Sequence, residues 1–213
     1  NVRIIFFQSN TIILDGLKKY YPDIPFISEE TKQIPFEVRK NWNRLWLIDP
    51  LDGTKEFIKK NGEFTVNIAL IENGVPVVGV VYVPAQQKIY FGAKGIGSFK
   101  VDEANQKLPI YNRVHYSTKQ KVTVVASRSH LDERTIQFVD ELKAKGKQVE
   151  FISSGSSLKF CLVAEGAADV YPRFAPTMEW DTAAAHAVAM YVGKNVINTA
   201  TNEPLSYNKE NLL

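Results

Sequence analysis

The chain has 213 residues, of which 45% are hydrophobic, 23% charged and 11% aromatic, and its 26 Lys and Arg against 23 Asp and Glu give a formal net charge of +3. This composition is typical of a globular protein and excludes a disordered tail, a collagen-like repeat and a disulfide scaffold. A small net charge with interleaved signs gives no indication of nucleic-acid binding, and no apolar run reaches the roughly 18 residues of a transmembrane segment.

Cysteine usage bears on the cellular compartment. The single cysteine, Cys161, has no partner for an internal disulfide, so a reducing compartment is expected. Its apolar neighbours Phe160, Leu162 and Val163 predict a position in the core. The first seven residues contain only a short apolar stretch and lack the cleavage site of a signal peptide. Together these features predict a cytoplasmic protein.

The first half of the chain is predicted to combine one helix with a run of strands. Apolar residues at helical spacing over 11–21 predict a helix that Pro22 ends. A short strand is predicted at 24–27, a polar surface segment at 31–44 and a buried strand at 45–48. Further strands, rich in Val and Ile or bounded by glycines, are expected at 64–71, 75–83, 88–92 and 97–101.

The second half alternates strands with helices. The predicted strands lie at 122–126, 149–152 and 168–171, and the predicted helices at 131–145, 156–164 and 180–192. In the first of these helices Ile136, Val139 and Leu142 are expected to face the core. Hairpins followed by alternating units predict an α+β fold with two sheet-plus-helix layers. We expect an N-terminal half at 1–110 and a C-terminal half at 111–213, joined in one compact unit.

The most informative stretch runs from Trp46 to Thr54 and places two carboxylates, Asp49 and Asp52, where a buried strand ends. Gly53 permits a close approach of the backbone to a ligand, and the N–H groups of a helix that starts at Thr54 attract an anion such as phosphate. Two acids beside an anion repel it unless a divalent cation lies between them, and oxygen ligands without His or Cys favour Mg²⁺ over zinc. A turn and a helix cap would also use Asp, but they do not explain two acids, Gly and Thr together.

Two more acidic residues are candidates to join this pair. Glu29 and Glu30 end a predicted strand, and Glu29 could reach the same edge of the sheet, although adjacent glutamates are also typical of a solvated face. Asp181 begins an Ala-rich helix, where the helix dipole favours a carboxylate and where ordinary helix-start chemistry is the alternative. The alanines at 183–185 would let this helix pack closely against a neighbour and so fix the direction of Asp181.

A family resemblance emerges from these residues. The pair Glu29-Glu30, the stretch from Trp46 to Thr54 and the run 180–184 resemble the three signatures of the lithium-sensitive, magnesium-dependent phosphatases typified by inositol monophosphatase. Within that family the chain looks most like the bacterial 3′(2′),5′-bisphosphate nucleotidases, over about residues 11–213. Supporting strings lie at 50–58, 61–70, 127–130, 155–161 and 171–173. The resemblance implies a layered αβαβα sandwich of the inositol monophosphatase and fructose-1,6-bisphosphatase type.

The resemblance also implies a mechanism of hydrolysis by a metal-activated water. Two or three Mg²⁺ ions would be held by Glu29, Asp49, the carbonyl of Leu51, Asp52 and Asp181. Glu29 and the Thr54 hydroxyl would orient the attacking water and take its proton. The N–H groups of Gly53 and Thr54 would hold the phosphate, so that no side-chain nucleophile is needed.

Substrate choice is expected to rest on the second half of the chain. The positions that match nucleoside and second-phosphate contacts in the nucleotidases are His130, Ser156, Lys159 and Arg173. Lys and Arg suit an additional phosphate, although His130 could instead cap a helix and the two cations could be surface charges. The implied reaction converts adenosine 3′,5′-bisphosphate to AMP and phosphate, with the 5′-phosphosulfate analogue as a further substrate.

Several alternatives stay open from the sequence. They are a phosphatase for inositol phosphate or fructose bisphosphate, a non-catalytic nucleotide- or metal-binding module, and a glycosidase with paired carboxylates, which would leave the anion site unexplained. The oligomeric state is also open, and family members can be peripheral on the cytoplasmic side of the inner membrane. The family normally carries a helix and an Asp-bearing loop before the position of Thr11, where this chain has ten residues.

Overall fold

A seven-stranded sheet organises the computed structural model, which describes residues 2–112, 114–127 and 132–213. The strands follow one another across the sheet in chain order, and each pairs antiparallel with the next except β1 and β2, which are parallel. They are β1 (Phe26–Ser28), β2 (Arg44–Asp52), β3 (Thr65–Glu72), β4 (Val75–Val83), β5 (Lys88–Ala93), β6 (Gly97–Val101) and β7 (Lys107–Pro109). The predicted hairpins of the first half are therefore confirmed.

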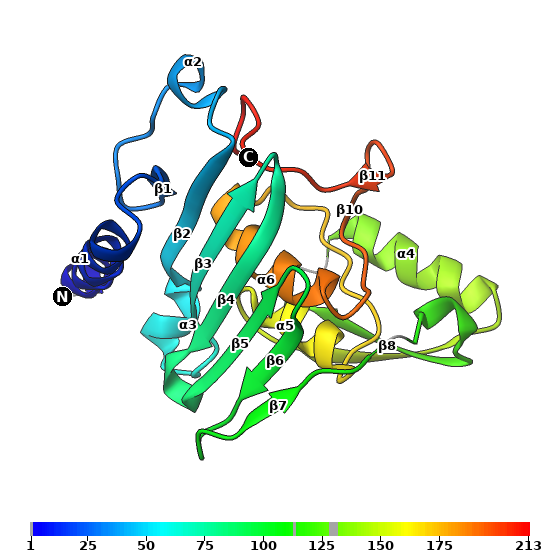
Figure 1. Cartoon of the computed structure of the whole chain (residues 1–213). Coiled ribbons are helices and arrows are strands. Elements are labelled where there is room, and N and C mark those ends of the chain that lie inside the picture. The colour runs from blue at the N-terminus through cyan, green and yellow to red at the C-terminus, as the bar shows by residue number, and fades with distance from the viewer. Residues whose placement is uncertain (1, 113, 128–131) are drawn as a thin grey trace.

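Helices cover both faces of the sheet at β2. Leu45 and Leu47 of β2 point into the main core beneath α6 (Glu179–Met190), while Trp46 and Ile48 pack in a second cluster with Leu14 of α1 (Val2–Tyr20). Figure 1 shows α1 beside β1 and β2, and α6 on the other side of the sheet. Burial on both faces explains why this strand is a continuous apolar run instead of an alternating one.

Helix α6 packs against the sheet at backbone distance. A Cβ atom at Gly79 of β4 would lie 2.1 Å from the carbonyl oxygen of Ala184, and one at Gly92 of β5 would lie 2.7 Å from that of Ala187. The close packing expected from the alanines at 183–185 is thus confirmed, and it depends on glycine in the facing strands. This contact holds the first turn of α6 in place above the end of β2.

The second half forms a smaller layer beside the sheet. Strands β8 (Lys121–Ala126) and β9 (Gln148–Ser153) pair in parallel. Helices α4 (Glu133–Ala144) and α5 (Leu158–Glu165) pack against them. The predicted strand at 168–171 is reduced to a single bridge from Val170 to Val124. Figure 1 shows this layer at the α6 side of the large sheet.

One core prediction for α4 is wrong. Val139 and Leu142 are buried, but Ile136 is 49% exposed. Thr135, one residue earlier, takes the inward position. Its backbone N–H donates to Asp132 Oδ1 at 2.7 Å, which caps the helix. A helix that covers only two strands buries a narrow stripe, and Ile136 lies beside that stripe.

The segment at 31–44 also differs from its prediction as a purely polar surface excursion. It contains the short helix α2 (Phe36–Arg39), and Arg39 is only 3% exposed. Its guanidinium donates hydrogen bonds to the carbonyl oxygens of Lys209 (2.6 Å) and Glu210 (2.8 Å). The sequence did not predict this burial, because a single cation that bonds to the carbonyls of a distant segment produces no periodic pattern of residues.

The remaining elements are short or differ at their ends. Helix α1 begins at Val2, well before the expected start at residue 11. The other elements are α3 (Thr54–Lys59), η1 (Pro84–Gln86), η2 (Tyr116–Thr118), β10 (Ile197–Asn198) and β11 (Glu203–Pro204). Among the described residues, no helix combines the length and hydropathy that a bilayer crossing requires.

Candidate active site

Three acidic side chains from distant parts of the chain meet where β2 ends. Asp49 and Asp52 come from the end of β2, and Asp181 comes from the first turn of α6. One carboxylate oxygen of each lies within 4.8 Å of the corresponding oxygens of the other two. The convergence expected from the sequence is therefore present in the structure.

A bulge in β2 lets both of its acids face the same side. Residues three apart on a regular strand point to opposite faces. In the β2–β3 ladder Asp49 lies opposite Asn67 and Asp52 lies opposite Thr65, so β2 has one more residue than β3 in this interval. The backbone N–H of Leu51, inside the bulge, donates to Asp49 Oδ1 at 2.9 Å. The bulge thus turns a three-residue spacing into a pair of neighbouring carboxylates.

Each of the other two acids is held by a hydrogen bond from outside β2. The backbone N–H of Ser157 donates to Asp52 Oδ2 at 2.6 Å. Asp181 Oδ2 accepts from Thr177 Oγ1 at 2.8 Å and from the Met178 N–H at 2.9 Å, as in a helix cap. The helix-start role considered for Asp181 is therefore present together with its place in the cluster.

Glu29 lies at the rim of this cluster and is not one of the three converging acids. It follows β1, its N–H donates to the Ile48 carbonyl at 3.2 Å, and its side chain interacts with that of Asp49. Partial burial raises the pKa of Glu29, and the charges of Asp181 and Glu30 raise it further. The predicted contact with the sheet edge is present, and the residue is exposed.

The acids are in an unfavourable electrostatic state without a cation. Burial raises the pKa of Asp49 well above its usual range, and repulsion from Asp52 adds to this. Burial and the charge of Asp181 raise the pKa of Asp52 to about 7, and burial also raises that of Asp181. A divalent cation between them would remove the repulsion, and a set of carboxylate oxygens suits Mg²⁺. The residues present therefore fit a magnesium site.

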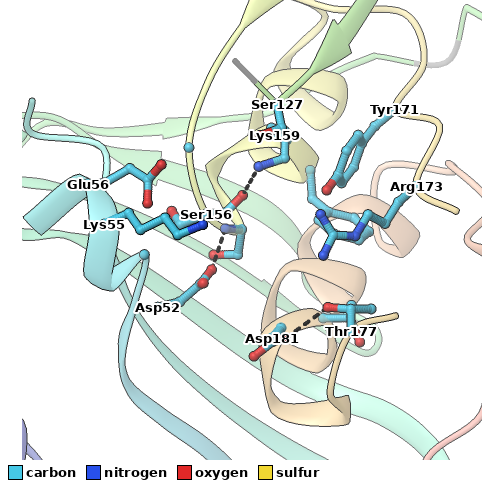
Figure 2. A pocket seen from close by; sticks show the side chains of 15 residues that line it. Asp52, Lys55, Glu56, Ser127, Ser156, Lys159, Tyr171, Arg173, Thr177 and Asp181 are labelled. Carbon is cyan, nitrogen blue, oxygen red and sulfur yellow. Dashed lines mark hydrogen bonds between the residues drawn. The ribbon is translucent and has the colours of Figure 1, made fainter. Parts of the chain in front are cut away.

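The same pocket has a cationic wall, which Figure 2 shows facing Asp52 and Asp181. Lys159 is 4% exposed, and its Nζ donates to the carbonyl oxygens of Ser156 (2.7 Å) and Ser154 (3.3 Å). Burial lowers the pKa of Lys159 to about 8. The surface-charge alternative is thus wrong for Lys159.

Arg173 lies on the same wall and is exposed. Its guanidinium donates to the carbonyl oxygens of Ala175 and Pro176, both at 3.2 Å. Between the two cations, the ring of Tyr171 lies 5.3 Å from Lys159 Nζ. The pocket therefore presents Lys159 and Arg173 on one side and, on the other, carboxylates with Lys55 beside them.

The other residues proposed from the sequence lie close by. Gly53, with φ of +91°, precedes α3 and lines the pocket, and Thr54 is the first residue of α3. Leu51 is buried between the two acids of β2, and Ser156 lines the pocket while its Oγ donates to the Glu63 carbonyl at 2.8 Å. His130 lies outside the described residues.

Sequence reasoning missed two residues that hold the acids, Ser157 and Thr177. Ser157 acts through its backbone N–H, which every residue other than proline has, so its side chain gave no signal for this contact. Thr177 also gave no signal, because the N-cap of α6 is Met178 and Thr177 lies one residue before it, outside the position at which a capping box has its hydroxyl.

Comparisons with known proteins agree with this geometry. The chain matches the Inositol monophosphatase family over residues 5–213. It is 48% identical over 188 residues to the 3′(2′),5′-bisphosphate nucleotidase CysQ of Salmonella typhimurium (88% of this chain, 72% of the relative). It is 46% identical over 199 residues to the enzyme of the same name from Escherichia coli K12 (93% of this chain, 76% of the relative).

Solved structures give the same picture. CysQ from Bacteroides thetaiotaomicron superposes with a TM-score of 0.81 at 50% identity, covering 89% of this chain and 74% of that one. Inositol monophosphatase II from Staphylococcus aureus superposes with a TM-score of 0.76 at 20% identity, covering 97% and 77%. The second likeness concerns the fold alone.

Proposed function

This chain belongs to the inositol monophosphatase family, and on that premise we propose that it is a Mg²⁺-dependent phosphatase that removes the 3′-phosphate of adenosine 3′,5′-bisphosphate, giving AMP and phosphate. The observation that carries the proposal is one pocket with Asp52 and Asp181 on one side and Lys159 and Arg173 on the other. A substrate with two phosphates can place the reacting one at the acids and the other at the cations.

The metal site of the proposal uses the converging acids. Asp49, Asp52 and Asp181, with Glu29 and the Leu51 carbonyl, would hold two or three Mg²⁺ ions. Bound Mg²⁺ supplies Lewis-acid chemistry, which neutralises phosphate oxygens and lowers the pKa of water. This role explains why acids that repel one another are kept together at a buried position.

The remaining steps belong to the chain's own groups. The N–H groups of Gly53 and Thr54, at the start of α3, would hold the phosphate for in-line attack. Glu29 and the Thr54 hydroxyl would orient the attacking water, and the Glu29 carboxylate would accept its proton. Glu29 lies beside Asp49 at the rim, where it can be reached by solvent.

Selection of a bisphosphate would rest on Lys159 and Arg173. Two carbonyls already orient the Lys159 ammonium, so little conformational entropy is lost when a second phosphate binds. Arg173 offers a planar fork of donors that matches phosphate oxygens. Ser156, beside them in the pocket, would add a contact to the nucleotide.

The test is release of phosphate under Mg²⁺ titration from adenosine 3′,5′-bisphosphate, its 5′-phosphosulfate analogue, inositol 1-phosphate and fructose 1,6-bisphosphate. We expect kcat/KM for the nucleotide to exceed that for the inositol and sugar phosphates by about tenfold or more, equivalent to about 1.4 kcal/mol. Faster hydrolysis of inositol phosphate would reject the proposed substrate.

Asp49→Asn supplies the decisive variant of this test. The substitution removes one carboxylate from the cluster, and we expect phosphate release to become undetectable. Asp15→Asn, at an exposed position of α1, is the matched control and should release phosphate at the normal rate. Binding of the nucleotide without turnover by the unsubstituted protein would indicate the non-catalytic module instead.

A further inference from the structure

Three buried polar side chains form a connected row directly behind the acids. Thr65 and Asn67 belong to β3, and Ser157 precedes α5; their exposed fractions are 0%, 1% and 2%. Ser157 Oγ lies 2.7 Å from Asn67 Oδ1 and 2.8 Å from Thr65 Oγ1. We call these residues the polar bridge, because they connect the large sheet to the loop before α5.

The direction of each hydrogen bond in the polar bridge follows from the number of protons. Asn67 Oδ1 can only accept, so Ser157 Oγ uses its single proton to donate to it. Ser157 Oγ therefore accepts from Thr65 Oγ1, which also lies 3.2 Å from Ser156 Oγ. With its oxygen toward Ser157, the carboxamide of Asn67 keeps both hydrogens of Nδ2 for other acceptors.

The polar bridge touches both acids of β2 through the register of the sheet. Because of the bulge, Asp49 is paired with Asn67 and Asp52 is paired with Thr65. Side chains of directly opposed residues share a face, with Cβ atoms about 5 Å apart. Ser157 closes the arrangement, since its backbone N–H holds Asp52 Oδ2 while its hydroxyl bonds to Asn67.

One atom of the polar bridge is left without a partner. Asn67 Nδ2 is buried and finds no acceptor among the described residues. A buried amide donor without a partner is unfavourable by about 1–3 kcal/mol. Its opposed residue is Asp49, a carboxylate in a cluster that needs compensation for its charge.

We propose that Asn67 is a positioning residue for the metal-binding carboxylates: Ser157 and Thr65 fix its amide, and its Nδ2 donates to Asp49 when the cluster holds Mg²⁺. The polar bridge then orients Asp49 through Asn67 and Asp52 through the Ser157 N–H. Hydrogen-bonded groups behind metal ligands typically change metal affinity by about 10- to 100-fold when they are removed. The inference rests on the metal site of the proposed function.

The test measures Mg²⁺ binding by isothermal titration calorimetry on the full chain, stripped of divalent cations and without nucleotide. We expect Ser157→Ala, which frees the Asn67 amide but keeps the N–H to Asp52, to raise the Kd for Mg²⁺ about tenfold. Asn67→Leu should raise it at least as much. The double variant should bind no more weakly than Asn67→Leu alone, because both changes break the same connection.

Ser98→Ala is the matched control. Ser98 is 3% exposed and its Oγ donates to the Val188 carbonyl at 2.8 Å, so its loss should lower the free energy of unfolding about as much as Ser157→Ala. Its Kd for Mg²⁺ should stay normal. Thr65→Ser, which keeps the hydroxyl, should also bind Mg²⁺ normally.

Two outcomes would overturn the inference: a Kd for Ser157→Ala within twofold of the unsubstituted protein, or an equal rise in Ser98→Ala. If Asn67→Leu does not fold, the Kd values of Ser157→Ala and Ser98→Ala for Mg²⁺ still test the inference. A protein that binds Mg²⁺ but does not hydrolyse the bisphosphate would refute the proposed reaction and leave this test of the polar bridge intact.

Discussion

Lys159 and Arg173 are two cations on one wall of the pocket, and they differ in how they are held. The ammonium of Lys159 is buried and bonds to two carbonyls of the loop before α5, so its removal would also loosen that loop. Arg173 is exposed, and its partners, the Tyr171 side chain and the carbonyls of Ala175 and Pro176, belong to its own segment. Arg173 can therefore be changed with little effect on the fold, which makes its role in binding easier to measure.

We expect Arg173→Met to lower kcat/KM for adenosine 3′,5′-bisphosphate by about 10- to 100-fold, because a hydrogen bond to a charged group contributes about 1.5–3 kcal/mol. Adenosine 3′-monophosphate, which has no second phosphate, should lose much less. Steady-state kinetics with the two substrates measures the difference, and the melting temperature should be unchanged.

Arg134→Met is the matched control for this prediction. Arg134 lies over the ring of Phe174, the residue that follows Arg173 in the chain, at 4.5 Å, and it is not among the residues that line the pocket. Its kinetics should match those of the unsubstituted protein for both substrates. Equal losses for the two substrates in Arg173→Met would contradict a role in binding the second phosphate.

At the scale of residues, the acids of the site could be predicted and their supports could not. Asp49, Asp52 and Asp181 are marked by motifs that combine several residue types. Asn67 gave a weaker signal, an amide in the middle of an apolar strand. Its importance depends on the bulge in β2, which sets Asn67 opposite Asp49 and which no residue pattern announces.

At the scale of elements, the contact of α6 with the sheet determines where Asp181 lies. Gly79 and Gly92 leave room for the helix backbone, and alanines on the helix fill the remaining space. Strands β7, β10 and β11, of two or three residues, are too short to show an alternating pattern, and they were not predicted. The equally short β1 was predicted from its apolar run at 24–27, and β2 from the apolar run at 45–48. Strands β3 and β4 and helix α6 were predicted nearly to their ends because their patterns extend over eight or more residues.

Gly79→Ala should destabilise the protein by about 3 kcal/mol or more, because a Cβ 2.1 Å from the Ala184 carbonyl must push α6 away from β4. Urea unfolding followed by circular dichroism measures the loss. Gly16→Ala is the control: a Cβ at Gly16 of α1 meets nothing within 4 Å. Alanine is the better helix former, so this variant should be about 0.5–1 kcal/mol more stable. If Gly79→Ala lowered the free energy of unfolding no more than an ordinary surface substitution does, the close packing of α6 on β4 would be contradicted.

At the scale of the whole molecule, the segment around Tyr207 ties distant layers together. The Tyr207 N–H donates to the Gly74 carbonyl in the turn between β3 and β4, and its hydroxyl lies 2.9 Å from Nδ1 of His186 on α6. Nearby, Glu179 at the start of α6 accepts from the Asn208 N–H at 2.6 Å. The segment thus holds α6 against the sheet from outside the pocket that Asp52 and Asp181 line.

The burial of His186 makes this region sensitive to acid. Burial lowers the pKa of His186 from 6.5 to about 4. Between these values the unfolded chain binds the proton and the folded chain does not, so folding stability is complete above pH 6.5 and falls as the pH drops toward 4. We expect His186 alone to account for about 2 kcal/mol of lost stability between about pH 7 and pH 5.

Urea unfolding of the unsubstituted protein and of His186→Gln at the two pH values tests this prediction. Glutamine does not titrate and can still bond to the Tyr207 hydroxyl, so the variant should lose about 2 kcal/mol less on acidification. The difference between the two proteins cancels the contribution of the acidic cluster, which titrates in both. Identical pH dependence of the two proteins would show that His186 is not the group responsible.

The layered α+β architecture was predictable from hairpins followed by alternating units, and the resemblance named the arrangement of the layers. The bonds between Arg39 and residues 208–210 were not, because a single side chain joins residues at least 169 positions apart. Such contacts have no periodicity, and only the assembled fold shows them.

The position of α6 has a consequence for synthesis on the ribosome. Strands β2 to β6 emerge before α6, and the face that they later present to α6 carries Leu45, Leu47 and Val81, which are buried in the finished molecule. Until residues beyond 190 have left the exit tunnel, α6 does not cover this apolar surface. Asp49 and Asp52 also lack Asp181, the third acid of the cluster, during this time. The nascent chain therefore passes through a stage in which it needs protection from aggregation before it can bind a metal ion.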